Sequence, residues 1–455
     1  MCTFAIYTSL QVMKIIHPSP VVGLQKKEEG KAYRLMHYVV QQEVEEGVLL
    51  YNTLTCALAL VTHEEAKNLT AVEDLIVHRF LVPVDHDDKR FCKVLKIGAK
   101  LMQKRPKGIK TYTVVTTTGC NARCAYCFEQ GTKPIHMTME MAEKVAQYIL
   151  NHRGEHEEVK IRWFGGEPLY NFKVMDRIST HLKEHDIKYY SNIITNGYLF
   201  SDKLVEKACD LWHLKKVQVT LDGTEENYNR IKAYVHTNGA NPYQRVMENI
   251  KRLLEAKIPT VNIRIHLTHD NFADVWALTE ECGERFRGYN NFHLYFIPLY
   301  EYFDSEDAQK VIQRKAIYDK KAKLEQLAQN IGLNRPPRHN KKEGIQLNQC
   351  MVDSEDAVMI LPEGELGLCE HYLDSRFIGH IDSDDWNQEE MKRAREYWEE
   401  IPECDTCAYY PRCYRLKICS NLDVCFKELR EDLIASIRHQ MIQDYRQALQ
   451  EATPD

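Results

Sequence analysis

The segment TTTGCNARCAYCFEQG, residues 116–131, decides how the rest of the chain is interpreted. It carries Cys120, Cys124 and Cys127 in the spacing C-x3-C-x2-C, directly after a β-branched run that predicts a strand. Three closely spaced thiolates can each bind one iron of a cubane iron–sulfur cluster, which leaves the fourth iron open for another ligand. A zinc site, which would need a fourth ligand close by, and a chance grouping of unligated cysteines are the alternatives.

Regular alternation of strand and helix patterns surrounds this segment. Strands are expected at 112–117, 159–164, 189–195, 217–221, 261–267 and 293–299. Helices are expected at 138–151, 172–184, 202–211, 243–256 and 272–286, with Thr138 and Ser201 as N-caps. Repeated β/α units imply parallel strands with right-handed crossovers, so the fold class is α/β, an α/β barrel or an open sheet. Active sites of such folds lie at the carboxyl ends of the strands, where the cysteine segment falls.

Composition and charge are those of a folded protein. The 455 residues are 44% hydrophobic, and 60 basic against 66 acidic residues give a net charge of −6. These values exclude a largely disordered chain and argue against nonspecific nucleic-acid binding. No stretch reaches the roughly 18 apolar residues of a membrane helix, and the N-terminus lacks the features of a signal peptide. We therefore expect a cytoplasmic protein, in which clustered cysteines are more often metal ligands than disulfides.

Cysteine is the one unusual residue type, with fifteen copies. Seven of them fall between residues 350 and 425: Cys350, Cys369, Cys404, Cys407, Cys413, Cys419 and Cys425. Five others are isolated, and we interpret them as small buried hydrophobic residues: Cys2, Cys56, Cys92, Cys209 and Cys282.

Residues 111–300 resemble the radical SAM superfamily. The signature C-x3-C-aromatic-C is present, with Tyr126 as the aromatic residue, which in the family lies against the adenine. The resemblance implies a partial (β/α)6 TIM barrel and a [4Fe–4S] cluster on Cys120, Cys124 and Cys127 that binds S-adenosylmethionine. One electron would then cleave S-adenosylmethionine into methionine and a 5′-deoxyadenosyl radical that abstracts a hydrogen atom. The protein's own share would be binding, orientation and exclusion of side reactions.

Further motifs stand at the predicted strand ends. The second strand ends in a loop that in the family meets the ammonium group of S-adenosylmethionine: Gly165, Gly166, Glu167 and Pro168. Glycines let backbone carbonyls approach closely, and a carboxylate can face a cation. The third and fourth strand regions, which in relatives contact the methionine carboxylate and the ribose, supply Thr195, Asn196, Thr220 and Arg230. For the last two, a structural strand residue and a surface arginine are the alternatives.

The seven C-terminal cysteines resemble the SPASM extension of radical SAM enzymes, over residues 345–427, with Gly364 five residues before Cys369. The resemblance implies two auxiliary clusters, hence three [4Fe–4S] clusters in all. The outer one would be held by Cys404, Cys407, Cys413 and Cys425, and the inner one by Cys350, Cys369 and Cys419. Five residues instead of the usual three separate Cys413 from Cys419. Because no extra cysteine follows Cys350, the inner cluster would have an open iron or a non-cysteine ligand. Two zinc sites are the alternative.

Residues 31–97 resemble the N-terminal region of radical SAM enzymes that modify ribosomally made peptides. There a small winged-helix-like α+β element binds the leader of the precursor, which adds a strand to a sheet edge. The pattern predicts a hairpin within 31–62, turning at Glu45–Gly47, and a short helix at 63–69. An accessory domain without peptide contact is the alternative.

Four segments are therefore expected along the chain. They are an N-terminal peptide-recognition-like domain at 1–103, the barrel at 104–304, a helical connector and linker at 305–344, and a SPASM domain at 345–455 that closes with a helix at 428–450.

Together the resemblances imply a SPASM-type maturase that modifies a ribosomally synthesised precursor peptide. A cross-link is expected, either a thioether, if an open inner iron binds a peptide cysteine, or a C–C or C–O bond. Epimerisation and side-chain oxidation are alternatives. The precursor peptide and reduced ferredoxin or flavodoxin are the expected partners, with no nucleic acid and no membrane. Asp353 and Glu129 lie near cluster ligands in sequence, and we interpret them as local hydrogen-bonding groups.

Two other functions compete with this interpretation. An anaerobic sulfatase-maturating type of enzyme would make formylglycine, but the missing cysteine near Cys350 and the added N-terminal unit argue against it. A noncatalytic iron–sulfur or zinc regulatory protein would not need the Gly-Gly-Glu-Pro loop.

Overall fold

The computed structural model divides the chain into two compact units. Unit 1 comprises residues 1–104, 337–349 and 397–455, and unit 2 comprises residues 105–336 and 350–396. The segment 345–455, predicted as one domain, thus contributes to both. The structure describes residues 14–18, 23–102, 106–127, 129–299, 308–333, 351–352, 354, 356–370, 376–394, 400–413, 425 and 427–452.

Unit 2 is built on a nine-stranded sheet in the order β12-β11-β10-β9-β8-β7-β13-β14-β15. Six parallel neighbours form its main part: β7 (Thr111–Thr117), β8 (Glu158–Gly165), β9 (Lys188–Thr195), β10 (Leu214–Thr220), β11 (Thr260–Leu267) and β12 (Phe292–Pro298). The strand β13 (Ala357–Ile360) continues the sheet parallel to β7, and β14 (Glu365–Gly367) and β15 (Gly379–His380) follow antiparallel. The predicted α/β class with a six-stranded parallel sheet of the partial-barrel kind is confirmed.

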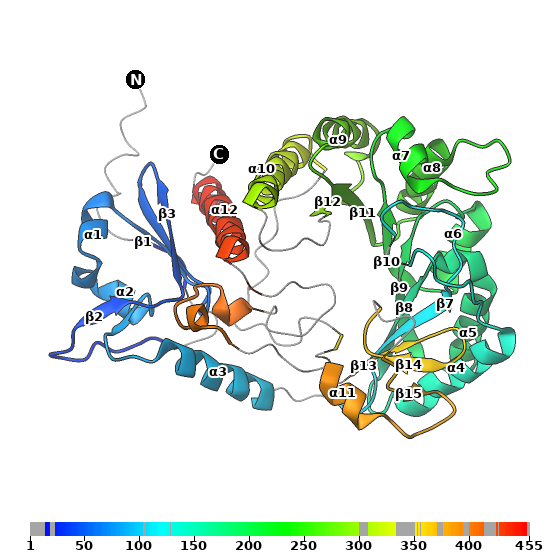
Figure 1. Ribbon diagram of the computed structural model, residues 1–455, viewed down its shortest axis with the longest axis horizontal. Coiled ribbons are helices and arrows are strands. Elements are labelled where there is room, and N and C mark those ends of the chain that lie inside the picture. Colours follow the sequence, from blue (N-terminus) through cyan, green and yellow to red (C-terminus); the bar gives the residue numbers. More distant parts are fainter. Residues whose placement is uncertain are drawn as a thin grey trace. The chain divides into compact units, whose positions relative to one another are not determined.

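Helices follow the strands on the outer side of this sheet (Figure 1). They are α4 (Met139–His152), the short η2 (Pro168–Asn171), α5 (Phe172–Glu184), α6 (Asp202–Asp210), α7 (Glu225–Lys232), α8 (Pro242–Glu255), α9 (Phe272–Phe286) and α10 (Ala308–Asn330). A further helix, α11 (Gln388–Ala394), comes after β15. The predicted N-caps are confirmed, since Thr138 accepts from the amide of Met141 and Ser201 from that of Leu204.

The helix α7 was not predicted, because its buried side chains are Tyr228 and Lys232. A helix that buries a lysine has no apolar stripe for the sequence to reveal.

Burial alternates along the parallel strands. On β8, Val159, Ile161 and Trp163 are fully buried in the core under the helices, whereas Lys160 and Arg162 are only partly buried. At the other face, Val115, Phe164, Met359 and Leu361 form a separate small apolar cluster. One face of the sheet is therefore the main core of unit 2, and the other is largely polar along several strands.

Unit 1 contains a four-stranded antiparallel sheet in the order β1 (Lys14–His17), β5 (Leu58–Val61), β4 (Gly47–Asn52) and β3 (Val39–Val44). The predicted hairpin is confirmed, since β3 and β4 pair with Val44 opposite Gly47. A small second sheet pairs β2 (Tyr33–Leu35) with β6 (Leu81–Pro83). The accompanying helices are α1 (His63–Lys67), the short η1 (Leu69–Ala71), α2 (Glu73–Val77) and α3 (Asp88–Met102).

Two C-terminal segments pack on these N-terminal elements within unit 1. The helix α12 (Lys427–Ala452) buries Ile437, Met441 and Tyr445 in one cluster with residues of β3, β4 and β5. The segment 400–413, with η3 (Pro402–Asp405) and η4 (Tyr410–Arg412), lies against α3. Among the described residues, no helix combines the length and the apolar character needed to cross a bilayer.

Glu400 anchors this second segment to α3. Its carboxylate forms ion pairs with Lys89 (2.6 Å) and Lys93 (3.0 Å) and accepts from the hydroxyl of Tyr410 (2.8 Å). Burial alone would raise the pKa of Glu400, but these partners outweigh it and lower the pKa to about 2, against an ordinary 4.5. The ionised carboxylate therefore holds the two segments together.

We predict that Glu400→Gln lowers the stability of the protein at pH 7 by on the order of 1 kcal/mol. Because the folded pKa lies below the unfolded one, this contribution is fully present above about pH 4.5 and is lost as the pH falls towards 2. Urea unfolding of wild type and variant between pH 7 and pH 3 checks this. The exposed Glu29→Gln is the control. A difference between wild type and Glu400→Gln that does not shrink with falling pH would contradict the account.

Candidate metal centre at the end of the parallel sheet

The three cysteines predicted as iron ligands lie on one loop that follows β7. All three are partly buried and free of disulfides. Burial raises the pKa of the Cys120 thiol, and the nearby charges of Glu167, Cys124 and Cys127 raise it further, so the sulfurs lie near one another. Within the described residues, no three His, Cys, Asp or Glu side chains converge as ligands of a single ion.

Backbone amides point at these sulfurs. The N–H of Ala122 donates to Sγ of Cys120 (3.4 Å), and the N–H of Glu129 donates to Cys127, which lowers the pKa of that thiol against the effect of burial. Such donors favour the thiolate, which is the form that ligates iron. The donor set therefore fits an iron–sulfur cluster.

Two glycines bring the end of β8 against the cysteine loop. A Cβ on Gly165, whose φ is +139°, would lie 2.1 Å from the carbonyl oxygen of Thr117. A Cβ on Gly166 would lie 2.6 Å from that of Gly119. In their place the amide of Gly166 donates to Thr117 (3.0 Å) and the amide of Glu167 to Gly119 (3.0 Å). The Gly-Gly pair is thus required for the backbone packing of the loop itself.

Glu167 is fully buried and joins the ends of β8 and β9. Its carboxylate accepts from the hydroxyl of Thr195 (2.7 Å), the amide of Asn196 (2.7 Å) and the amide of Leu169 (3.1 Å). Burial nevertheless raises the pKa of this carboxyl to about 7. The Asn196 side chain in turn donates to Asn121 in the cysteine loop (2.7 Å). The structure thus brings Glu167, Thr195 and Asn196 together beside the cysteines, with Pro168 as the first residue of η2.

A buried ionic network that the sequence analysis did not predict lies beside the loop. Asp222 and Lys232 are each only 2% exposed and form an ion pair of 2.8 Å. The Lys232 ammonium also donates to the Tyr126 hydroxyl (2.6 Å), which itself donates to Asp222. His266 Nδ1 pairs with the other oxygen of Asp222 (2.9 Å).

The positive charge of Lys232 compensates the negative charge of Asp222 within this network. Burial would raise the pKa of Asp222, but the charge of Lys232 and the bond from His266 hold it well below its usual range. Lys232 also lowers the pKa of the Cys124 thiol, although burial raises that pKa more. The predicted aromatic Tyr126 is thus fixed by a lysine and an aspartate, with its ring edge-on to His266 at 4.6 Å.

The end of α7 also holds the loop through its backbone. The amide of Arg123 donates to the carbonyl of Lys232 (2.9 Å), and the amide of Val235 donates to that of Asn121 (2.8 Å). Lys232 therefore contacts the cysteine loop with both its side chain and its main chain. The spacing of Tyr228 and Lys232, one helical turn apart, could have indicated that both lie on the buried face of one helix. The charged and polar residues around them in EENYNRIK made that helical pattern hard to recognise.

The side chains of the other predicted residues form no hydrogen bond with this group among the described residues. Thr220 is partly buried at the end of β10. Arg230 is exposed on α7 and donates to Asn227 of its own helix (3.0 Å). Glu129 has one buried carboxylate oxygen without a hydrogen-bond partner in the described part of the chain, and burial raises its pKa to about 7. Asp353 lies outside the described residues.

The four predicted outer-cluster cysteines lie together in unit 1. After burial, the charges of Cys413 and Cys425 are the next causes that raise the pKa values of the Cys404 and Cys407 thiols, so the four sulfurs are neighbours. Of the predicted inner ligands, Cys369 follows β14 in unit 2, whereas Cys350 and Cys419 lie outside the described residues.

The isolated cysteines behave mostly as predicted. Cys56, Cys92 and Cys282 are buried, Cys209 is partly buried, and Cys2 lies outside the described residues.

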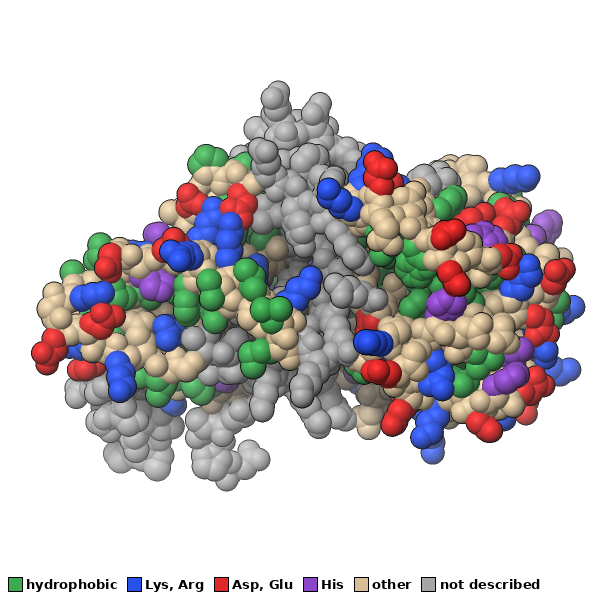
Figure 2. Space-filling model, turned by 90° about the horizontal axis from the view of Figure 1, so that it is seen from below, with side chains coloured by type: hydrophobic (Ala, Val, Ile, Leu, Met, Phe, Trp, Pro, Cys, Tyr) green, Lys and Arg blue, Asp and Glu red, His purple; other side chains and the backbone are tan. Residues whose placement is uncertain are grey.

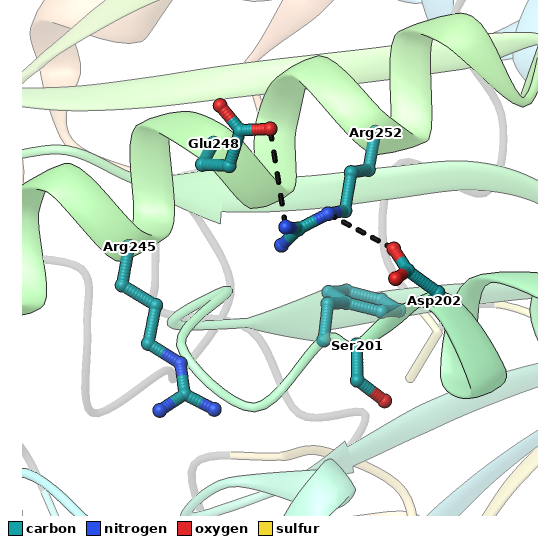
Figure 3. Close-up of a pocket in the computed structure, with 6 residues that line it drawn as sticks. Ser201, Asp202, Arg245, Glu248 and Arg252 are labelled. Carbon is teal, nitrogen blue, oxygen red and sulfur yellow. Dashed lines mark ion pairs between the residues drawn. The ribbon is translucent and has the colours of Figure 1, made fainter.

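A separate shallow depression of 340 Å³ lies between the start of α6 and α8 (Figure 3). Arg252 crosses it to pair with Asp202 (3.0 Å) and lies near Glu248 (3.9 Å). Arg245 lies over the ring of Tyr198 at 4.4 Å. None of its lining residues was predicted as a site residue, and Arg252 is already neutralised by carboxylates.

Residues 114–282 match the family model of the Radical SAM superfamily. This part of the chain, which contains the cysteine loop, is a radical SAM region. Membership implies S-adenosylmethionine and one [4Fe–4S] cluster, which the cysteine loop and its amide donors fit.

Individual relatives agree with this assignment. The radical SAM cyclopropyl synthase TigE of Paramaledivibacter caminithermalis is 30% identical over 165 residues, which are 32% of this chain and 33% of TigE. A GTP 3′,8-cyclase of Clostridium perfringens is 25% identical over 283 residues, which are 60% of this chain and 84% of that enzyme. The chain thus matches only a third of the length of TigE.

Solved structures show the same fold. Native anSMEcpe with bound AdoMet gives a TM-score of 0.54 at 17% identity, over 74% of this chain and 99% of that chain. The same protein with AdoMet and a Kp18Cys peptide gives 0.53 at 18% identity, with the same coverage.

We predict that Lys232→Met destabilises the protein by about 3 kcal/mol, because it leaves the buried Asp222 without its cation. The double variant Asp222→Asn, Lys232→Met should lose less than the sum of the two single variants, since neither charge is then left alone. Urea unfolding of the four proteins measures both quantities. Arg230→Met, on the exposed side of the same helix, is the matched control. Equal losses for Lys232→Met and Arg230→Met would refute a buried ion pair.

Proposed function

We propose that this radical SAM protein modifies a ribosomally synthesised precursor peptide and forms a cross-link in it. The observation that carries the proposal is the gathering of Cys404, Cys407, Cys413 and Cys425 in unit 1, beside the small N-terminal sheet. A second group of cysteines, in addition to that of the barrel, is characteristic of the SPASM extension. This group shares unit 1 with the N-terminal α+β elements, as expected for an enzyme that binds and modifies peptides.

The residues of unit 2 hold and orient the cofactors. Cys120, Cys124 and Cys127 would bind the catalytic [4Fe–4S] cluster, and the Gly165–Pro168 loop with Thr195, Asn196, Thr220 and Arg230 would bind S-adenosylmethionine. When bound, these groups supply a 5′-deoxyadenosyl radical, which abstracts a hydrogen atom from the substrate. The chain's own part is to fix the loop: Lys232 and Asp222 hold the Tyr126 ring where an adenine could lie against it.

The remaining cysteines would hold the two auxiliary clusters. Those of unit 1 form the outer one, and Cys350, Cys369 and Cys419 the inner one, with an open iron or another ligand. These clusters would accept the electron left on the substrate after hydrogen abstraction. Reduced ferredoxin or flavodoxin would supply the electron that starts the reaction.

The N-terminal sheet would bind the leader of the precursor. Its outermost strands in the described part of the chain are β1 and β3, and a leader can add a strand to such an edge through backbone hydrogen bonds. That the fold of anSMEcpe has been solved with AdoMet and a Kp18Cys peptide supports a peptide substrate for the same architecture.

We predict that anaerobic reconstitution gives about twelve irons per chain, from three cubanes. Replacing Cys120, Cys124 and Cys127 by alanine should remove about four irons and abolish formation of 5′-deoxyadenosine. Replacing the four unit 1 cysteines should remove about four irons and leave reductive cleavage of S-adenosylmethionine detectable. Iron analysis and chromatography of 5′-deoxyadenosine measure this, with Cys209→Ala as the control. A wild-type content of about four irons would contradict the assignment of the two auxiliary clusters. Zinc in place of iron would contradict the assignment of all three clusters.

The bond that is formed is tested by mass spectrometry. A short reading frame beside the gene should encode the precursor, and the reduced, reconstituted enzyme should remove two hydrogens from that peptide and join two of its side chains. Deletion of the leader should abolish the reaction. A formylglycine product, or turnover of a leaderless peptide at an equal rate, would favour the sulfatase-maturating alternative instead.

A further inference from the structure

Positive charge gathers on the polar face of the sheet in unit 2. Lys160 and Arg162 alternate along β8 with the residues of the helix-covered core. Lys216 holds the equivalent position on β10, where it precedes the buried Val217. All three are partly buried, so they belong neither to the dry core nor to the freely solvated surface.

The strand register places the three cations in one neighbourhood. Arg162 pairs with Asn192 of β9, and Asn192 pairs with Lys216 of β10. Since neighbouring strands lie about 4.8 Å apart, the backbones of Arg162 and Lys216 are separated by roughly 10 Å. Lys160, two residues earlier on β8, lies about 7 Å from Arg162 along the strand.

The three charges repel one another. Burial lowers the pKa of the Lys160 ammonium, and the charges of Arg162, Lys216 and Lys110 lower it further. Burial and Arg162 lower the pKa of Lys216 in the same way. A lowered pKa means that the folded protein disfavours the charged form of the lysine.

One carboxylate faces this group within the part of the chain that the structure describes. Both oxygens of Glu370 lie 3.5 Å from Nη1 of Arg162. Neither Lys160 nor Lys216 has an ion pair with a described residue, so the described part of this face carries more positive than negative charge. The outer surface differs, because acidic and basic side chains are interspersed over the face shown in Figure 2.

Polar groups complete the surface around the cations. Asn192 of β9 lies between Arg162 and Lys216 in the strand register. Two residues after Lys216 on β10, Gln218 accepts a hydrogen bond from the hydroxyl of Tyr295 (2.8 Å). Arg264, in register with Tyr295, has a buried Nε without a hydrogen-bond partner in the described part of the chain. Several donors thus accompany the positive charge.

We propose that Lys160, Arg162 and Lys216 form a binding face for carboxylates of the substrate, an acidic stretch of the peptide to be modified. This proposal rests on the proposed function, because it names the chemistry of the segment that enters the barrel. Acidic side chains at alternate positions of an extended peptide are also spaced by about 7 Å, as Lys160 and Arg162 are. Cations spread over two strands match such a segment better than a single compact phosphate.

A pair of synthetic twelve-residue peptides tests the proposal, one with glutamate at alternate positions and one with glutamine in those places. Binding to the reconstituted enzyme with S-adenosylmethionine is measured by fluorescence anisotropy. We expect the glutamate peptide to bind at least about tenfold more tightly than the glutamine peptide, and less tightly as salt increases. Lys160→Met and Lys216→Met should each weaken it by about fivefold or more. Lys203→Met, an exposed lysine of α6, should leave it unchanged.

A stability measurement separates binding from a structural role. Because the two lysines repel their neighbours, Lys160→Met and Lys216→Met should raise the melting temperature of the free enzyme by about 2–4 °C. A binding residue without a partner in the free protein behaves in this way, whereas a structural residue would lower the melting temperature when replaced.

Three results would overturn the proposal. They are equal binding of the two peptides, a lower melting temperature of both lysine variants, and binding of inorganic phosphate that depends on the lysines while the glutamate peptide does not bind. The proposed function fails separately: if the glutamate peptide binds through the lysines but no peptide is modified, the acidic-ligand face stands and the maturase assignment falls.

Discussion

The buried ion pair between Asp222 and Lys232 is the interaction on which the candidate centre depends. It joins the end of β10 to the end of α7, and through the Tyr126 hydroxyl it reaches the middle of the cysteine loop. A charged pair that is 2% exposed is tolerated only if its remaining hydrogen-bonding capacity is satisfied. His266 and Tyr126 provide this, so one network fixes two strand ends, a helix end and the aromatic residue of the cysteine motif.

The second organising feature is the division of the cysteines between the two units. The loop with Cys120 belongs to the parallel sheet, whereas the group around Cys404 belongs to the unit that also contains the N-terminal sheet. Lys89 and Lys93 of α3 hold the latter segment through Glu400. An element that would bind a leader peptide and an element that would bind an auxiliary cluster thus share one folded unit.

The sequence predicted the regular part of unit 2 well, for physical reasons. Strands buried on one face and helices with apolar stripes have clear periods, so the expected helices agree with α4, α5, α6, α8 and α9 to within one residue at each end. Cysteine spacing likewise located the loop, and the Gly-Gly-Glu-Pro motif located the strand end beside it. The close backbone approach at Gly165 and Gly166 explains why that motif is so informative.

What the sequence could not predict are interactions between distant polar residues. Lys232 and His266 are ordinary residues in their local context, and only the fold makes them partners of Asp222. For the same reason Arg230, chosen by its position after the fourth strand, is exposed while Lys232, two residues later, is buried. The packing of residues 400–413 on α3 depends on side chains more than 300 positions apart, and no local pattern encodes it.

Electron paramagnetic resonance of the reduced, reconstituted protein, with and without S-adenosylmethionine, shows whether the cysteine loop holds a cluster with an open iron. We expect S-adenosylmethionine to change the signal of one cluster and to leave the signals of the other clusters unaffected. The cluster that responds should be absent when Cys120, Cys124 and Cys127 are replaced. Spectra that are identical with and without S-adenosylmethionine would contradict an open iron at the cysteine loop.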